Sequence, residues 1–143
     1  MTTYLLDVNL LLALMDPMHI HHDAAHRWFA LKGKESWATC PLTENGFVRV
    51  ASHPRYPNSV GNVGAVLGLL DQFCGLVGHV FWTADVTIRE LINPKVVLGH
   101  NQLTDIYLLG LAVHHQGKLA TLDQRIPASL IDGGAASLEL IDI

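Results

Sequence analysis

The chain has 143 residues, half of them hydrophobic and only 15% charged, and this composition excludes an intrinsically disordered segment. Its 9 Lys and Arg against 13 Asp and Glu give a net charge of −4, which argues against a protein that holds long nucleic acid by bulk electrostatics. The length predicts a single domain, residues 1–143, with a substantial core.

Cysteine usage and hydrophobicity indicate an intracellular protein. Cys40 and Cys74 lie in apolar stretches, so we expect two buried, reduced thiols. The first nine residues carry no basic residue and contain Asp7, which does not resemble a secretion signal. The apolar run at 10–15 is far too short to span a bilayer. We therefore expect a cytoplasmic protein without a membrane segment.

A short apolar strand followed by two helices is predicted at the start of the chain. The run at 4–6 ends abruptly in Asp7, and such a run is typical of a strand buried on both faces of a parallel sheet. A helix is predicted over 8–15, ending before Pro17 because proline disfavours helix in the residue before it. A second, amphipathic helix is predicted over about 23–31.

The middle of the chain repeats this strand-and-helix alternation. A strand is predicted over 36–40, and Thr43 then occupies the position of a helix N-cap. This cap would place Glu44 in the first turn of the following helix. Apolar spacing predicts a further helix over 60–74 and a third strand over 79–83.

The last third of the chain continues the pattern. A short helix is predicted over 86–92, and a longer one over 103–115 with Thr104 as its cap. Strands follow at 119–122 and, on an edge, at 138–141. The whole alternation predicts an α/β fold with a parallel sheet of four or five strands covered by helices.

Four acidic residues lie where the predicted strands end or the predicted helices begin. Taken singly, each has a structural explanation, such as ending a strand or favouring the N-terminal end of a helix dipole. Their joint placement is harder to explain that way, because all strand C-termini of a parallel sheet lie along one edge. We expect four carboxylates to converge there: Asp7, Glu44, Asp105 and Asp123.

Converging carboxylates predict a divalent cation. Left uncompensated, the four groups would repel one another and raise one another's pKa values. All-oxygen ligation favours Mg²⁺ or Mn²⁺ over zinc, which prefers nitrogen and sulfur. Such a centre can activate a water molecule and neutralise charge that develops on a phosphodiester.

Four sequence blocks carry a resemblance to a known family. Residues 4–14 resemble the opening of PIN-domain ribonucleases, and residues 41–50 resemble bacterial toxins of the VapBC type. Matches at 99–112 and 120–125 follow in the order found in that family, so the resemblance covers essentially the whole chain.

The resemblance implies a three-layer α/β/α PIN-like fold and a metal-dependent endoribonuclease that serves as the toxin of a type II toxin–antitoxin system. It also implies a homodimer, an RNA substrate, an Mg²⁺ or Mn²⁺ cofactor and a cognate antitoxin whose tail lies over the acidic pocket. Carried over by position, the catalytic and metal-binding set would be Asp7, Glu44, Asp105 and Asp123.

Other polar residues in the matching blocks are candidates for supporting roles. Asn9 and Thr121 are placed to orient the carboxylates by hydrogen bonds. Arg49 lies beyond Glu44 on the same predicted helix, where it would contact phosphate or pair with an acid. His100 is close to the third acid in sequence, which makes a solvated loop residue or a substrate contact possible.

Several other residues are expected to have structural rather than catalytic roles. His22 and His26 have the spacing of a helical zinc pair, but no glutamate of the H-E-x-x-H motif lies between them, so surface histidines are expected. Asp85 follows a predicted strand and is the reserve candidate for the acidic set. Core positions, rather than base-stacking roles, are expected for Trp28, Trp37 and Trp82.

Three other classes of protein share features with this sequence. A haloacid-dehalogenase-like phosphatase needs D-x-D after the first strand, and here the third position is Asn9. A receiver-type signalling domain uses a lysine on its last strand, and 119–122 contains none. A catalytically silent PIN-like module that acts only through protein partners stays open, although the chain keeps all four acids. Metal-dependent RNA cleavage separates that module from an enzyme.

Overall fold

A five-stranded parallel sheet crosses the protein, and the computed structural model describes residues 1–143. The strand order is β3-β2-β1-β4-β5, with every neighbouring pair parallel, which confirms the predicted sheet. Each strand lies within one or two residues of its predicted bounds. The strands are β1 (Tyr4–Leu6), β2 (Trp37–Thr39), β3 (His79–Phe81), β4 (Lys118–Thr121) and β5 (Leu138–Leu140).

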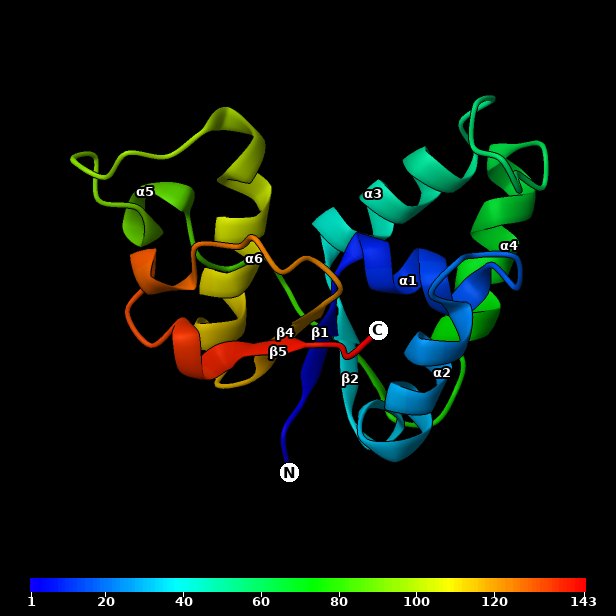
Figure 1. The fold of residues 1–143 in the computed structure, drawn as a ribbon, viewed down its shortest axis with the longest axis horizontal. Helices are drawn as coiled ribbons and strands as arrows, with labels where there is room; N and C mark the ends of the chain where they lie inside the picture. Colours follow the sequence, from blue (N-terminus) through cyan, green and yellow to red (C-terminus); the bar gives the residue numbers. More distant parts are fainter.

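Six α-helices cover the two faces of the sheet, which gives the three-layer arrangement that the sequence predicted. Figure 1 shows α1 to α4 on one side of the sheet, and α5 and α6 on the other. Two short 3-10 helices near the C-terminus, Ala128–Leu130 and Ala135–Ser137, lie on the α6 side. The α-helices are α1 (Val8–Met15), α2 (His22–Leu31), α3 (Pro41–Ala51), α4 (Val63–Cys74), α5 (Ile88–Leu91) and α6 (Leu103–His114).

An apolar core lies on each face of the sheet, and β1 contributes to both. Tyr4 and Leu6 point into the core beneath α1 to α4, while Leu5 points into the core beneath α6. Leu5 and Leu6 are fully buried, and burying one leucine side chain stabilises a fold by roughly 1.5–3 kcal/mol. The prediction of a strand buried on both faces is confirmed. The expected core tryptophans are also buried: Trp28, Trp37 and Trp82.

The start of α3 differs from the prediction. The helix begins at Pro41 with Cys40 as its N-cap, so the prediction of Thr43 as the cap is wrong. Proline suits the first helical turn because its missing N–H would have no partner there anyway. The Thr43 hydroxyl instead accepts a hydrogen bond from the backbone N–H of Cys40 at 3.0 Å. Glu44 is in the first turn, as predicted.

The start of α6 also lacks the predicted cap. Gln102 occupies the N-cap position without a side-chain hydrogen bond, and Thr104 already lies inside the helix. A preceding 3-10 turn, His100–Gln102, leads the chain into α6. Asp105 is in the first helical turn, where the sequence placed it.

Two other helices are shorter than predicted, because polar side chains fix their starts. The helix predicted over 60–74 begins only at Val63, after the Asn62 side chain accepts from the N–H of Ala65 at 2.8 Å. The helix predicted over 86–92 is α5 alone, with Thr87 as its cap.

Close packing of α3 on α1 fixes the edge of the sheet where the predicted site lies. A Cβ atom built on Gly46 would lie 2.8 Å from Cγ2 of Val8, so a larger residue at this position would push the two helices apart. Because Val8 directly follows Asp7, this contact also positions α3 next to the first predicted site residue.

No helix of the protein is both long enough and apolar enough to cross a membrane.

Candidate functional site

Asp7 is the buried centre of the candidate site. It ends β1 and caps α1, where its Oδ1 accepts from the N–H of Val8 at 2.8 Å. Its Oδ2 accepts from the hydroxyl of Thr121 at 2.7 Å, and the residue is 5% exposed. Burial raises the pKa of Asp7, the two hydrogen bonds oppose this rise, and the charge of Asp123 adds to it. The carboxylate is therefore rigidly held and poorly solvated.

Thr121 and Asn9 bind the end of β4 to the start of α1. The Asn9 amide nitrogen donates to Thr121 Oγ1 at 3.2 Å, and the Asn9 amide oxygen accepts from the N–H of Leu122 at 3.2 Å. The N–H of Asp123 also donates to Thr121 Oγ1, at 3.1 Å. The expected role of Asn9 and Thr121 in orienting the carboxylates matches these contacts, since one hydroxyl joins the Asp7 side chain to the Asp123 backbone.

Asp105 enters the same site from the first turn of α6. Burial, followed by the negative charges of Asp7 and Asp123, raises its pKa to about 6, and the nearby Arg125 acts in the opposite direction. Arg125 lies closest to Asp123, with its Nε 3.5 Å from Oδ1. The structure thus brings together three of the four predicted carboxylates, close enough to disfavour one another's ionisation.

Glu44 makes its contacts in a second polar cluster. Its Oε2 accepts from the Thr39 hydroxyl at 2.6 Å, and Thr39 Oγ1 also lies 2.7 Å from Nε2 of His79. A carboxylate oxygen of Glu44, Sγ of Cys74 and a ring nitrogen of His79 all lie within 4.8 Å of one another. The expectation that Cys74 is buried is wrong, because its side chain is only partly covered at the end of α4.

The two clusters lie on opposite faces of the sheet at its carboxyl edge. Thr39 follows Trp37 by two residues on β2, so it faces the core beneath α1 to α4. Thr121 follows Leu119 by two residues on β4, so it faces the core beneath α6. Asp7 bonds to Thr121 and shares that face. Glu44 is therefore held by Thr39 on the other side of the sheet from the partner of Asp7.

The three aspartates suit a hard divalent cation. They offer only carboxylate oxygens, which are the ligands that Mg²⁺ and Mn²⁺ prefer. Burial raises the pKa values of Asp7 and Asp105, and the charges of the neighbouring carboxylates add to both shifts. A divalent cation would offset those negative charges, so the donor set fits the cofactor that the sequence predicted.

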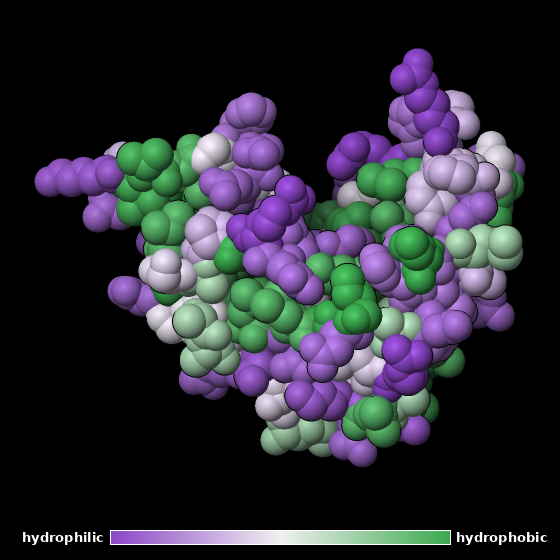
Figure 2. Space-filling view, viewed as in Figure 1, coloured by the Kyte–Doolittle hydropathy of each residue, from purple (hydrophilic) through white to green (hydrophobic).

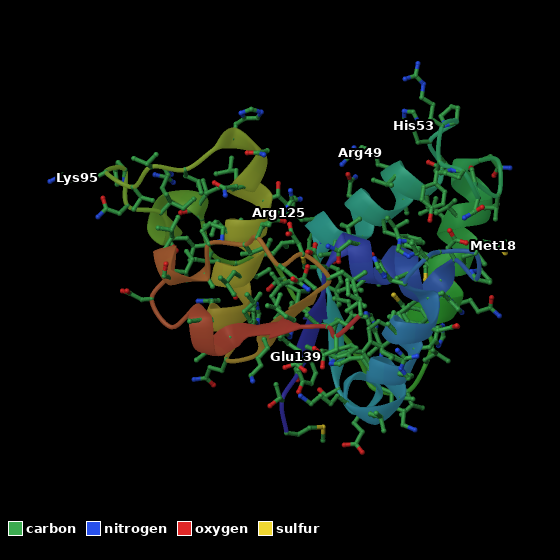
Figure 3. All side chains as sticks on the ribbon, in the orientation of Figure 1. Met18, Arg49, His53, Lys95, Arg125 and Glu139 are labelled. Carbon is green, nitrogen blue, oxygen red and sulfur yellow. The ribbon has the colours of Figure 1, made fainter.

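Basic side chains flank the acids at an open notch. Figure 2 shows the notch between the two helical sides of the molecule, at the top of that view. Figure 3 places Arg49 of α3 and Arg125, which follows β4, on either side of it. Both are exposed, and Arg49 forms no ion pair, so the alternative that it pairs with an acid is wrong.

A recess of about 520 Å³ adjoins Asp123. Sequence reasoning gave no role to three of the residues lining it, namely His19, His21 and Arg125. The two histidines lie in the loop between α1 and α2, so only the fold brings them to the end of β4. The one available signal was for Arg125, which lies two residues after Asp123 within a matching block.

The remaining sequence candidates lie elsewhere. His22 Nδ1 lies 2.7 Å from the carbonyl oxygen of Ala13, and His26 Nε2 lies 2.8 Å from that of Leu14. These histidines close the carboxyl end of α1 rather than forming a zinc pair. Asp85, the reserve candidate, lies 3.4 Å from His114 and 3.0 Å from His115 near the end of α6. It does not belong to the cluster of site aspartates.

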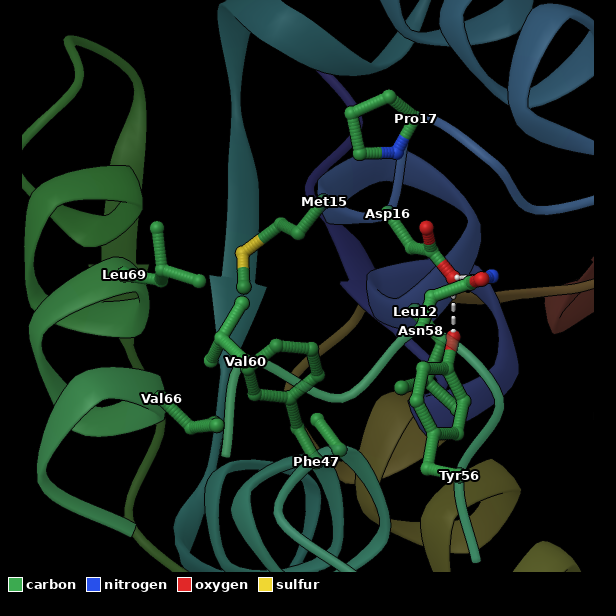
Figure 4. Close-up of a pocket in the computed structure, with 11 residues that line it drawn as sticks. Leu12, Met15, Asp16, Pro17, Phe47, Tyr56, Asn58, Val60, Val66 and Leu69 are labelled. Carbon is green, nitrogen blue, oxygen red and sulfur yellow. Dashed lines mark hydrogen bonds between the residues drawn. The ribbon is translucent and has the colours of Figure 1, made fainter. Parts of the chain in front are cut away.

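A small apolar pocket of about 70 Å³ lies between α1, α3 and α4 (Figure 4). Phe47 and Val66 line its floor, and Met15 lies at its side. Asp16 closes the rim, where its Oδ2 accepts from the Tyr56 hydroxyl at 2.6 Å. Exposed aliphatic side chains continue this surface along α4 and the segment before it: Val60, Val63, Leu67 and Leu69.

Comparison with known proteins finds close relatives among curated sequences. The chain is 41% identical over 131 residues to Ribonuclease VapC44 of Mycobacterium tuberculosis, covering 90% of this chain and 92% of the relative. It is 38% identical over 138 residues to Ribonuclease VapC39 of the same organism, covering 95% and 96%. No family model matches the chain.

Solved structures share the fold at low sequence identity. The structure of VapC20 from M. tuberculosis, described as a sarcin-ricin loop cleaving toxin, matches with a TM-score of 0.62 at 10% identity, covering 90% of this chain and 95% of that chain. The structure of VapBC2 from Rickettsia felis, bound to a DNA fragment from its promoter, matches with a TM-score of 0.58 at 15% identity, covering 98% and 99%.

Proposed function

The chain belongs to the VapC family of ribonucleases, and from this membership we propose that it is a metal-dependent endoribonuclease, the toxin of a type II toxin–antitoxin pair. The observation that carries the proposal is the convergence of Asp7, Asp105 and Asp123 at the carboxyl edge of the sheet. This is the edge at which open α/β sheets bind their ligands.

The proposed cofactor is Mg²⁺ or Mn²⁺, held by Asp7, Asp105 and Asp123. When bound, the cation supplies positive charge that acidifies a water molecule and offsets charge on the phosphodiester. Thr121 and the N–H of Val8 fix both oxygens of Asp7 while leaving each a further lone pair for a cation. Burial of Asp7 lowers the local dielectric and strengthens attraction between these carboxylates and any cation bound there.

Glu44 is the fourth member of the proposed set by its position in the family motif. In this structure its carboxylate accepts from Thr39, so joining the aspartates would require it to leave that hydroxyl. A side chain in the first turn of α3 has the length to change its rotamer without moving the helix. We propose that this change accompanies the binding of cation and RNA.

Localised basic groups, rather than the net charge, are proposed to hold the RNA. The total charge is −4, so long-range attraction to a polyanion is weak. Arg49 and Arg125 flank the notch with exposed guanidinium groups, which suit phosphate recognition. The recess lined by His19 and His21 beside Asp123 offers space for a nucleotide next to the acids.

An antitoxin is the proposed protein partner. One solved neighbour is a VapBC complex, and this chain carries apolar surface that suits such a partner. The pocket between α1, α3 and α4 accommodates one aliphatic side chain, and the exposed aliphatic residues along α4 extend the surface around it. Homodimer formation and a cytoplasmic location stay predictions from the sequence.

Cleavage of total cellular RNA by the purified protein tests the function. Reactions contain Mg²⁺, Mn²⁺ or chelator, and Asp7→Asn is compared with Asp132→Asn, which removes an exposed carboxylate outside the site. Discrete fragments are expected with either cation, from the wild type and Asp132→Asn only. Absence of cleavage under every condition would favour the catalytically silent binding module, while cleavage in chelator would contradict the metal requirement.

A further inference from the structure

The polar cluster around Thr39 contains three different kinds of metal-binding side chain. Glu44 comes from the first turn of α3, Cys74 from the last residue of α4, and His79 from the first residue of β3. A carboxylate oxygen, a thiol sulfur and an imidazole nitrogen from these residues lie within 4.8 Å of one another. All three side chains are partly exposed, so a cation reaches them from solvent without unfolding.

We propose that Glu44, Cys74 and His79 form a binding site for a borderline-soft transition-metal cation of the Zn²⁺ class, distinct from the proposed Mg²⁺ site. Sulfur and imidazole ligands select such cations, whereas the aspartates across the sheet offer oxygen alone. Three protein ligands leave a fourth tetrahedral position for water. In a zinc site, ligand atoms lie about 2.0–2.3 Å from the metal, so the three groups need only a modest approach by side-chain rotation.

Metal binding would change the protonation of the cluster. A cation bound by Cys74 would release the thiol proton to form the thiolate, as metal coordination generally does.

Neighbouring residues hold the three ligands close together. The Thr39 hydroxyl donates to Glu44 at 2.6 Å, so its contact with His79 Nε2 at 2.7 Å requires the ring nitrogen to donate. The Trp37 ring lies against His79 at a centroid distance of 4.7 Å. These two contacts restrict the orientation of the His79 ring beside Glu44.

Occupation of this site would restrain the nuclease, a consequence that rests on the proposed function. Glu44 belongs to both centres, since the family motif assigns it to the catalytic set while the structure places it beside Cys74 and His79. A cation bound by those two side chains would keep the Glu44 carboxylate on the far side of the sheet from Asp7. Zn²⁺ would therefore inhibit RNA cleavage by removing one carboxylate from the active centre.

Cobalt(II) absorption tests the site without any use of RNA. A cobalt–thiolate bond gives a near-ultraviolet charge-transfer band, and we expect it in the wild type with displacement by Zn²⁺ but not by excess Mg²⁺. We expect the band to be lost in Cys74→Ser and His79→Gln and retained in the matched thiol control Cys40→Ala. Melting temperatures confirm that each variant is folded. Absence of the band from the wild type, or its persistence in folded Cys74→Ser, would overturn the site.

Zinc titration of RNA cleavage in saturating Mg²⁺ tests the coupling. Each variant is compared with its own rate before zinc is added, and we expect the wild type and Cys40→Ala to lose activity at zinc levels that leave Cys74→Ser unaffected. Equal inhibition of Cys74→Ser would overturn the coupling through Glu44. Failure of the proposed function would be seen separately, as a cobalt band in a wild-type protein that cuts no RNA with any cation.

Discussion

Two polar clusters lie at the carboxyl edge of one sheet, and they differ in how their charges are balanced. On the α6 face, Asp7 and Asp105 have raised pKa values because burial and neighbouring carboxylates disfavour their ionisation. On the opposite face, the Glu44 carboxylate accepts a short hydrogen bond from Thr39 and lies near the Cys74 thiol and the His79 imidazole. The first cluster therefore brings like charges together, whereas the second places one carboxylate beside a hydroxyl, a thiol and an imidazole.

The place of a residue in the sequence motif does not by itself determine which side chains it meets in the fold. All four acids end a strand or begin a helix, but the face of the sheet decides which of them meet. Asp7 and Asp105 come from β1 and α6, whose contact brings them together on one face. Glu44 begins a helix that packs on the other face. Removing a carboxylate charge should therefore affect RNA cleavage and stability differently in the two clusters.

The largest expected effect is on RNA cleavage. Asp105→Asn removes one charge from the aspartate cluster and should lower kcat/KM on the order of 10³-fold, since metal-assisted charge stabilisation is worth several kcal/mol. Glu44→Gln should also lower the rate if the carboxylate joins the cluster when cation and RNA bind. Steady-state kinetics on a defined RNA fragment measures both, and an unchanged rate in Asp105→Asn would remove that residue from the active centre.

A smaller effect is expected from the hydroxyl that orients Asp7. Thr121→Val keeps the side-chain shape but removes the donor at 2.7 Å from Asp7, and loss of such a supporting hydrogen bond weakens metal affinity or activity by roughly 10–100-fold. The matched control is Thr3→Val, which breaks a threonine–serine hydrogen bond at the opposite end of the sheet. Similar Mg²⁺ dependence of cleavage in both variants would show that Thr121 serves stability alone.

Without metal, removing a carboxylate charge should affect the melting temperature differently in the two clusters. In chelator, Asp105→Asn should raise the melting temperature by about 2–4 °C, because a neutral side chain ends the repulsion with Asp7 and Asp123. Glu44→Gln should not raise it, because that carboxylate stabilises the fold through Thr39. Mg²⁺ should reverse the order by stabilising the wild type more than Asp105→Asn. Thermal unfolding with and without Mg²⁺ checks all three results.

A smaller effect is expected for Glu139, an acid whose pKa is lowered rather than raised. Burial tends to raise the pKa of Glu139, but hydrogen bonds from Lys32 at 2.8 Å and Trp28 at 3.0 Å outweigh it, and the net pKa is lowered. Glu139→Gln should therefore cost about 1 kcal/mol at pH 7, a figure already reduced because Lys32 is largely exposed. Since the folded-state pKa is the lower one, this stabilisation should be lost as pH falls below the usual carboxyl value of 4.5. Chemical denaturation of both proteins from pH 7 to pH 3 measures it.

Much of the fold followed from local patterns in the sequence. The strand at β1 and the helix at α1 were predicted with their observed bounds, because an apolar run and a following proline define them. The caps at Thr43 and Thr104 were predicted wrongly. In each case a neighbouring feature starts the helix earlier: Pro41 in α3, and the preceding 3-10 turn in α6.

The site was predictable to the extent that strand ends determine it. Asp7 and Asp123 follow neighbouring strands of the sheet, so their proximity could be deduced from the parallel topology. The contacts of Glu44 could not, because they depend on a rotamer and on Cys74 and His79, which lie 30 or more residues away. The same holds for His19 and His21, whose loop reaches the end of β4 only in the folded chain.

Anomalous diffraction from crystals grown with Mn²⁺ would locate the cation without relying on activity. We expect a manganese peak among the carboxylates of Asp7, Asp105 and Asp123, absent from crystals of Asp105→Asn. A peak bounded by Glu44 as well would establish the proposed change of its rotamer. A peak confined to the Thr39 side of the sheet, or no peak in the wild type at saturating Mn²⁺, would contradict the assignment of the three aspartates as the metal centre.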